Sequence, residues 1–324
     1  MARRPVLLAT LTAAVTAAGL LGAAPAANAG LVTHCIGTGG AVTVPNDLYV
    51  PAGESCSLTG TIVTGNVSVA AGGNLVITGG KLAGEVRVAG DGYFDASDTE
   101  VSGVVVLAAG GYGVYLKDAK SGSVTVRPKG TTTVDSFFFA EGSEITGSVN
   151  VQAGEVRLDR SSSVTGNVSS TGTYYTDLHD SFVDGTLSVL NSATGSVVCG
   201  SSVKGKATFA GNLGGVQLGP NGGLDSCASG GYFGRDVSVT STTGGVTVDD
   251  NIIDGVLTAT GNTPVATIAD NNRIRRGVVT DPAPAAARSA ARAVTPRGDD
   301  DTAKAEERRS DAVQEATVAG PADL

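Results

Sequence analysis

The sequence of 324 residues has no tryptophan, 4% aromatic residues and only two histidines. A nucleophilic triad would have to use His34 or His179, and His179 is followed directly by Asp180 and Ser181. Side chains of neighbouring residues at a turn diverge, so these three do not converge on a substrate. We interpret His179 as a solvated turn residue, and the scarcity of histidine argues against histidine-based catalysis.

Positive charge is also scarce. The formal net charge is −9, and it becomes −11 when Arg3 and Arg4 are removed with the N-terminal segment. Proteins that bind nucleic acid neutralise phosphates with a basic stripe. The sequence has no such stripe, and we expect no nucleic-acid partner.

The apolar run of residues 6–26 has the features of a secretion signal. Two arginines precede it, and Ala27-Asn28-Ala29 has the small-x-small form of a signal-peptidase site. We expect a signal peptide over residues 1–29, export by the general secretory route in preference to the twin-arginine route, and an extracellular protein. The alternative is an uncleaved membrane helix, but Gly and Pro interrupt the run.

Residues 282–324 have a different composition from the rest of the chain. They contain no aromatic residue and no isoleucine, and they alternate alanine with charge. Such a segment buries too little apolar area to offset the entropy of ordering, so we expect a disordered tail. A short helix over residues 302–315 is compatible with its composition, although isolated helices of that length are marginal. The tail shows no wall-sorting signal, and we expect no membrane anchor.

Glycine is abundant: 43 of the 47 glycines lie in residues 30–281, together with many Val, Thr and Ser. This is the composition of strands and turns. The phrase VTGNVSV at residues 63–69 recurs along the region. Its central position is occupied in turn by Gly65, Gly84, Gly103, Gly122, Gly147, Gly166, Gly185, Gly205, Arg235, Gly255 and Arg276. The steps are 19, 19, 19, 25, 19, 19, 20, 30, 20 and 21 residues, a period that indicates a solenoid.

Period-two alternation gives the phrase its two faces. Residues two apart in a strand share a face, so the central glycine and its apolar neighbours should point inward, while Thr64, Asn66 and Ser68 point outward. Five residues before the centre, ten of eleven coils carry Gly, Asp, Ser or Asn, which indicates a turn at the same corner of every coil. We predict an all-β, right-handed parallel β-helix of about 11–12 coils over residues 30–281, with an N-terminal cap over residues 30–58.

The repeat resembles that of bactofilins, bacterial β-helices that polymerise end to end, over most of residues 42–280. The phrases DNIIDG at 250–255 and DNNRI at 270–274 are similar to the Asn-bearing turns of parallel β-helix repeats, and GVLTATGNTP at 255–264 is similar to a phrase of secreted bacterial repeat proteins. The resemblance implies the fold. Bactofilins are cytoplasmic and this chain carries an export signal, so we expect a monomer or small oligomer, not a filament.

Four cysteines in an exported chain should pair. Cys35 and Cys56 are 21 residues apart, and Cys199 and Cys227 are 28 apart, so each separation is close to one coil. Stacked coils place residues about 4.8 Å apart, within the reach of a disulfide. We predict these two disulfides. A metal site of His34, Cys35 and Cys56 is the weaker alternative, because no C-x-x-C pair supports it.

Carboxylates are the better candidates for catalysis. Asp249, Asp250 and Asp254 are followed about one coil later by Asp270 and Arg275. Asp250, Asp270 and Arg275 could act in catalysis, and Asp249, Asp250 and Asp270 could hold calcium. Asp250 also occupies the turn corner, however, and we favour that structural role. We expect no cofactor and no resident metal.

Aromatic residues offer the remaining hint of a ligand. Phe137-Phe138-Phe139, Tyr174-Tyr175 and Tyr232-Phe233 could stack on sugars, but alternate members fit the apolar column. If residues 137–139 form a strand, at least one ring should be exposed. We therefore expect a secreted structural or surface-interaction β-helix without catalysis. The sequence does not identify its partner, for which a cell-surface glycan or a protein is the candidate. The alternatives are a polysaccharide-binding or polysaccharide-cleaving β-helix and, more weakly, an ice-binding one.

Overall fold

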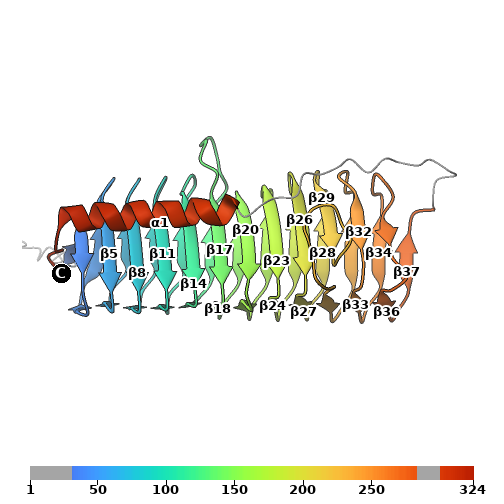
Figure 1. The fold of residues 1–324 in the computed structure, drawn as a ribbon, viewed down its shortest axis with the longest axis horizontal. Helices are drawn as coiled ribbons and strands as arrows, with labels where there is room; N and C mark the ends of the chain where they lie inside the picture. Colours follow the sequence, from blue (N-terminus) through green and yellow to red (C-terminus); the bar gives the residue numbers. More distant parts are fainter. Residues whose placement is uncertain (1–30, 283–299) are drawn as a thin grey trace, which may run out of the picture. The chain divides into compact units, whose positions relative to one another are not determined.

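The chain folds into a parallel β-solenoid with a helix along one side (Figure 1). The structure, a computed structural model, describes residues 31–282 and 300–324. The expected signal peptide and its cleavage site lie outside these residues and stay predictions. No helix within the described ranges is long and apolar enough to cross a membrane.

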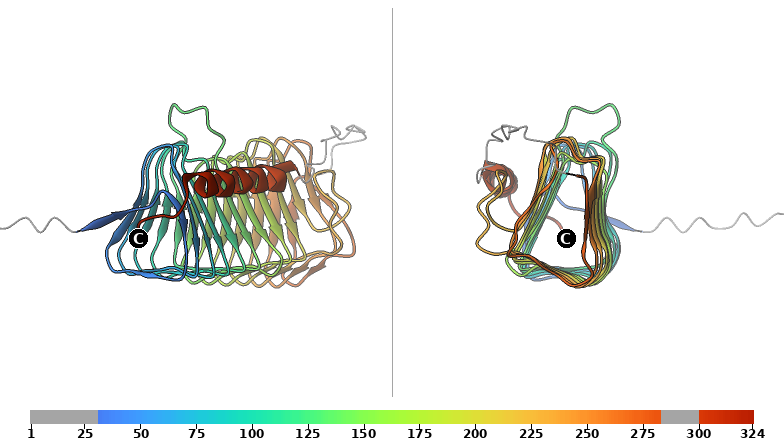
Figure 2. Two further views of the ribbon diagram at one scale, coloured as in Figure 1. Left: turned by 60° about the vertical axis from the view of Figure 1, so that its left-hand side comes forward. Right: turned by 90° about the vertical axis from the view of Figure 1, so that its right-hand side faces the viewer.

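Three parallel sheets form the faces of the solenoid, which has a three-sided cross-section (Figure 2). The first sheet contains β1 (Val32–His34), β4 (Asp47–Val50), β7 (Val67–Val69), β10 (Val86–Val88), β13 (Val105–Leu107), β16 (Val124–Val126), β19 (Val149–Val151), β22 (Val168–Thr171), β25 (Leu187–Leu190), β28 (Ala207–Ala210), β31 (Val237–Thr240), β34 (Leu257–Thr260) and β37 (Val278–Thr280).

The second sheet has longer strands. It contains β2 (Gly37–Gly39), β5 (Ser55–Thr59), β8 (Asn74–Thr78), β11 (Tyr93–Ser97), β14 (Gly113–Lys117), β17 (Phe137–Glu141), β20 (Glu155–Asp159), β23 (Tyr175–His179), β26 (Gly195–Cys199), β29 (Gly215–Leu218), β32 (Val246–Val248) and β35 (Thr267–Ile268).

The third sheet consists of two-residue strands. It contains β3 (Thr43–Val44), β6 (Ile62–Val63), β9 (Lys81–Leu82), β12 (Glu100–Val101), β15 (Lys120–Ser121), β18 (Glu144–Ile145), β21 (Ser163–Val164), β24 (Phe182–Val183), β27 (Ser202–Val203), β30 (Tyr232–Phe233), β33 (Ile252–Ile253) and β36 (Arg273–Ile274). The predicted all-β solenoid of about twelve coils is confirmed, while its right-handedness stays a prediction.

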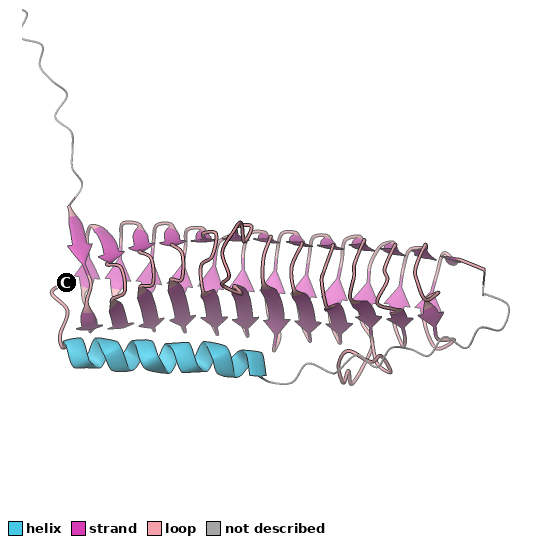
Figure 3. Cartoon of the chain, turned by 90° about the horizontal axis from the view of Figure 1, so that it is seen from above, coloured by secondary structure: helices cyan, strands magenta, loops and turns pink. Residues whose placement is uncertain are grey.

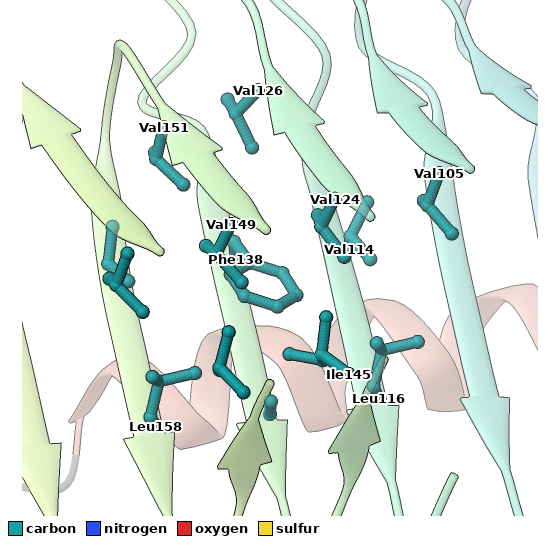
Figure 4. Packing of buried hydrophobic residues seen from close by; sticks show 14 of the residues in the cluster. Val105, Val114, Leu116, Val124, Val126, Phe138, Ile145, Val149, Val151 and Leu158 are labelled. Carbon is teal, nitrogen blue, oxygen red and sulfur yellow. The ribbon is translucent and has the colours of Figure 1, made fainter. Parts of the chain in front are cut away.

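The apolar column predicted from the repeat fills the inside of the coils. Phe138 and Val149 are fully buried, and Val105, Val124 and Val149 follow one another up the first sheet in register (Figure 4). Burying each such side chain stabilises the fold by about 1.5–3 kcal/mol relative to leaving it exposed. The corner turn is also confirmed. Eight of the eleven corner residues have a positive φ: Gly60, Gly79, Asp98, Gly142, Ser161, Asp180, Gly200 and Asp250.

The central glycine of the phrase does not point into the column as expected. It lies at the corner between the third and first sheets, where the backbone of one coil passes close to that of the next. A Cβ added at Gly103 would collide with the backbone carbonyl oxygen of Gly84, and one added at Gly122 would collide with that of Gly103. Close approach of the backbone is therefore what requires glycine here.

The tail is not disordered over residues 300–324. It forms α1 (Asp300–Ala319), which packs along the outer face of the second sheet (Figure 3). Gly320 ends the helix with a φ of 89°, and its N–H donates to the Ala316 carbonyl at 3.2 Å. Residues 283–299, the rest of the expected tail, lie outside the described ranges.

The N-terminal end of the solenoid is closed by a segment from the far end of the chain. Residues 31–58 form regular strands, β1 to β5, and not an irregular cap. The Thr38 N–H donates to the Gly320 carbonyl, and the Ala322 N–H donates to the Thr38 carbonyl, both at 2.8 Å. Ala322 and Leu324 then pack against the apolar column. We call residues 320–324 the C-terminal plug. They cap the first coil, a role that the sequence analysis assigned to residues 30–58.

Both predicted disulfides are present. Cys35 pairs with Cys56 at a Cα–Cα distance of 5.6 Å, and Cys199 pairs with Cys227 at 5.4 Å. The first links the first two coils beside the C-terminal plug. The second ties residues 219–231, the long loop between β29 and β30, to β26.

Candidate functional site

The outer face of the second sheet carries most of the unusual chemistry of the molecule. Its outward positions hold aromatic and ionisable side chains that are buried, such as Tyr93, Asp95, Phe139 and Asp177. Two segments cover them: α1 lies over the earlier coils, and residues 219–231 lie over β23 to β29. This face is the candidate site because it buries charged side chains, whereas outward charges of the third sheet, such as Lys81 and Glu100, form exposed ion pairs.

The three phenylalanines of β17 are all buried, which the sequence analysis did not expect. Phe138 points into the column, while Phe137 and Phe139 point outward and are covered by α1. Their rings stack on each other at 4.5 Å, and Tyr93 and Tyr115 extend the cluster. No exposed ring is therefore left on β17. Of the other aromatic pairs, Phe233 joins the column and Tyr175 lies under Leu224, while Tyr174 and Tyr232 are exposed.

α1 is held mainly by polar contacts, because the side chains it buries are alanines: Ala305, Ala312 and Ala316. Arg309 pairs with the fully buried carboxylate of Asp95, and it also donates to Ser97 Oγ at 3.0 Å. Tyr93 Oη donates to the second oxygen of Asp95 at 2.7 Å. Burial raises the pKa of Asp95, and the Arg309 cation and the Tyr93 hydrogen bond oppose that rise.

A cavity of about 190 Å³ lies where α1 begins, between Phe137, Phe139, Glu155, Tyr174 and Lys304. Pockets that hold drug-sized ligands have volumes of about 300–1,000 Å³. A larger hollow of about 410 Å³ beside the last turns of α1 is an open depression bordered by exposed helix residues. Neither has the form of a cleft for a polymer.

The second covered region contains a cluster of one histidine and two carboxylates. Asp177 and His179 are outward residues of β23, and Asp225 comes from the loop of residues 219–231. His179 Nε2 lies 3.0 Å from Asp177 Oδ1 and 3.1 Å from Asp225 Oδ2. It is the one group of three or more potential metal ligands within the described ranges.

The electrostatics of the cluster follow from its partial burial. Burial raises the pKa of Asp177, against the opposing effect of His179. Burial lowers the pKa of His179, but the contact with Asp177 and the charges of Asp177 and Asp225 outweigh it and raise that pKa to about 9. His179 is the last residue of β23, and the loop of residues 219–231 partly covers its side chain. It is therefore not the solvated turn residue expected from the sequence.

The carboxylates proposed from the sequence are not brought together. Asp249 is buried and accepts a hydrogen bond from Asn221 Nδ2 at 2.8 Å, whereas Asp250 and Asp270 are exposed. Arg275 pairs with Asp254 at 3.1 Å. Asp249, Asp250 and Asp270 form no common ligand cluster, and Asp250 has the positive φ of its turn. The structural interpretation of Asp250 therefore fits its geometry.

His34 lies on β1 and contacts Tyr49, with ring centroids 5.2 Å apart. Cys35 and Cys56 are engaged in their disulfide, so they supply no thiolate to a metal.

The strands of the first sheet carry no charged residue over its later coils, from β22 to β34. Ser169, Ser188, Thr208, Ser238 and Thr258 stand opposite one another on β22, β25, β28, β31 and β34. All five are half-buried and belong to one column, which we call the hydroxyl column.

No family model, curated protein or solved structure matches the chain. The resemblance to bactofilins thus rests on the repeat phrase, and the functional argument rests on the chemistry of these faces.

Sequence reasoning missed the Asp177–His179–Asp225 cluster for a definable reason. The alternation Tyr175-Thr176-Asp177-Leu178-His179 places Asp177 and His179 on one face, and this signal was available. Asp225 has no repeat position, and only the folded loop brings it to β23.

Proposed function

We propose that this protein is a secreted, non-catalytic solenoid that acts by surface contact, with the first sheet as its contact face. The observation that carries the proposal is the hydroxyl column: five Ser or Thr residues in register on five successive coils, without an intervening charge. Coils are about 4.8 Å apart, so the column is a regular row of hydroxyl groups on a flat sheet.

A flat row of hydroxyl groups suits a hydroxyl-rich partner, and we propose a cell-surface glycan. Ser and Thr hydroxyls both donate and accept hydrogen bonds, so they can match sugar hydroxyls in either role. The column itself carries no charge, although the exposed residues Lys206 and Asp236 lie just before β28 and β31. The polysaccharide-cleaving alternative receives no support from the separated positions of Asp250 and Arg275 described above.

Binding of the mature protein, residues 30–324, to a glycan array and to insoluble polysaccharides tests the proposal. Thr208→Lys places a cation in the middle of the hydroxyl column, and we expect it to abolish binding. Ser202→Lys is the matched control, because Ser202 is a half-buried outward residue on the third sheet. Loss of binding in both variants, or in neither, would contradict the assignment of the first sheet.

Ice binding is a second candidate that the same column favours. On earlier coils, the outward positions of the first sheet include Arg87 and Val106, which would interrupt a row of hydroxyl groups. From β22 to β34 the row is uninterrupted. Thermal hysteresis that disappears in Thr208→Lys and survives in Ser202→Lys would select this candidate over a glycan.

A further inference from the structure

The Asp177–His179–Asp225 cluster has a geometry that its own protons do not satisfy. Nε2 of an imidazole carries at most one hydrogen, and here two carboxylate oxygens lie 3.0 and 3.1 Å from it. The hydrogen bond is formed with Asp225. Asp177 Oδ1 is buried and accepts no hydrogen bond despite its short distance to the ring. A buried carboxylate oxygen that accepts no hydrogen bond is costly, and a cation that contacts Asp177 Oδ1 directly would remove that cost.

We propose that Asp177, His179 and Asp225 bind one divalent transition-metal ion, with Zn²⁺ as the best match. One imidazole and two carboxylates are donors that Zn²⁺ accepts, with ligand distances of about 2.0–2.2 Å. Two ligands at about 2.1 Å and at right angles are about 3.0 Å apart, and at the tetrahedral angle about 3.4 Å. The observed separations from Nε2 are close to the first value. Ca²⁺ fits less well, because it prefers oxygen ligands only.

Binding would place the metal on Nε2 and leave the ring proton on Nδ1, so no proton leaves the site if His179 is neutral and one leaves if it is protonated. The ion would neutralise the two carboxylates and give Asp177 Oδ1 its missing partner. The side chains of His179 and Asp225 are 22% and 27% exposed, so water can complete the coordination.

The position of the cluster explains what the ion would do. His179 stands beside Cys199 in the ladder between β23 and β26, and Cys199 is bonded to Cys227 two residues after Asp225. A metal bridge between β23 and Asp225 would therefore hold the loop of residues 219–231 at a second point, next to the disulfide. This role is independent of the hydroxyl column, which lies on another sheet.

The test is zinc binding by untagged mature protein that has been stripped with a chelator, measured by isothermal titration calorimetry and by elemental analysis. We expect one Zn²⁺ per chain and at least tenfold weaker binding in His179→Gln and in Asp225→Asn. His34→Gln is the matched control, since it removes the other histidine and leaves the cluster intact.

Two outcomes would overturn the proposal: no stoichiometric binding of Zn²⁺, Mn²⁺ or Ni²⁺ by the stripped protein, or binding that is unchanged in both cluster variants. The group would then be an ion pair only. Asp225 belongs to a surface loop, so Asp225→Asn keeps the test decisive if His179→Gln does not fold. Hydrogen exchange in residues 219–231 should also slow on addition of Zn²⁺, which an ion bound elsewhere would not cause.

Discussion

Individual glycines allow the coils to stack closely. At the corner between the third and first sheets, Gly103 faces the carbonyl oxygen of Gly84, and no side-chain atom fits between them. Here the requirement comes from the neighbouring coil, since Gly103 has no positive φ. The repeated glycine therefore lets neighbouring coils come close enough for their backbones to form hydrogen bonds.

We expect Gly103→Ala to destabilise the protein by about 1–3 kcal/mol, because the new Cβ must push two coils apart. Gly90→Ala is the control: its Cβ would have the Ala109 carbonyl oxygen at 3.7 Å, an ordinary contact. Urea unfolding followed by circular dichroism measures both. Equal stability of the two variants would show that the coils can separate at the corner without cost.

Among the elements, α1 is the one that depends most on a few side chains. Its buried residues are alanines, which contribute little apolar area, and its strongest contact is the pair of Arg309 with Asp95. We expect Arg309→Ala to weaken docking of the helix by about 2 kcal/mol, since it removes a hydrogen-bonded charge from a buried carboxylate.

Hydrogen exchange of residues 300–319 measures this docking, and the expected acceleration is about 30-fold for a loss of about 2 kcal/mol. Gln314→Ala changes an exposed residue of the same helix and should leave exchange unchanged. Equal exchange in Arg309→Ala and Gln314→Ala would mean that the alanine contacts alone hold the helix.

The effect of Arg309→Ala should depend on pH because Asp95 is the group left behind. Burial already raises the pKa of Asp95, and loss of the cation that opposes this rise raises it further. A carboxyl group with a raised folded-state pKa stabilises the fold below its unfolded pKa of about 3.9, and that contribution is lost as the pH rises through the folded pKa. The stability difference between wild type and Arg309→Ala should therefore be larger at about pH 7 than at about pH 4. A difference that grows on acidification would contradict the role given to Asp95.

The sequence predicted the repeating elements well and α1 poorly, for the same physical reason. Residues such as Val149 and Ile145 recur with a period that only stacked coils can bury, so strand positions and both disulfides could be predicted. α1 has alanine as its apolar residue, and its composition gives no sign of the face it covers. Phe137 and Phe139 were the missed clue, since outward aromatic residues on a strand require a cover.

At the scale of the whole molecule, the two ends of the solenoid differ. The C-terminal plug closes the first coil, whereas Val278 of the last coil is 45% exposed although its ladder partner Leu257 is fully buried. An open end presents unpaired backbone groups and apolar side chains, which favour association with another chain.

Deletion of residues 320–324 should open the N-terminal end and increase end-to-end association, as measured by light scattering and negative-stain microscopy. The backbone pairing at Thr38 and the cover over the apolar column are both lost. Val318→Ser is the control, because Val318 is 82% exposed and its loss uncovers nothing. Particles of unchanged size after the deletion would show that the first coil needs no cap.

The C-terminal plug also bears on the order in which the molecule is made. Residues 320–324 follow every coil along the chain, and coils can stack one upon another as the chain emerges from the ribosome or from a membrane channel. The first coil made is thus the last to be sealed, and its sealing requires translation to continue past residue 319. We expect a chain that stops after the coils to fold but to keep an uncovered first coil that associates with other chains. Residues 320–324 would then link the completion of synthesis to solubility.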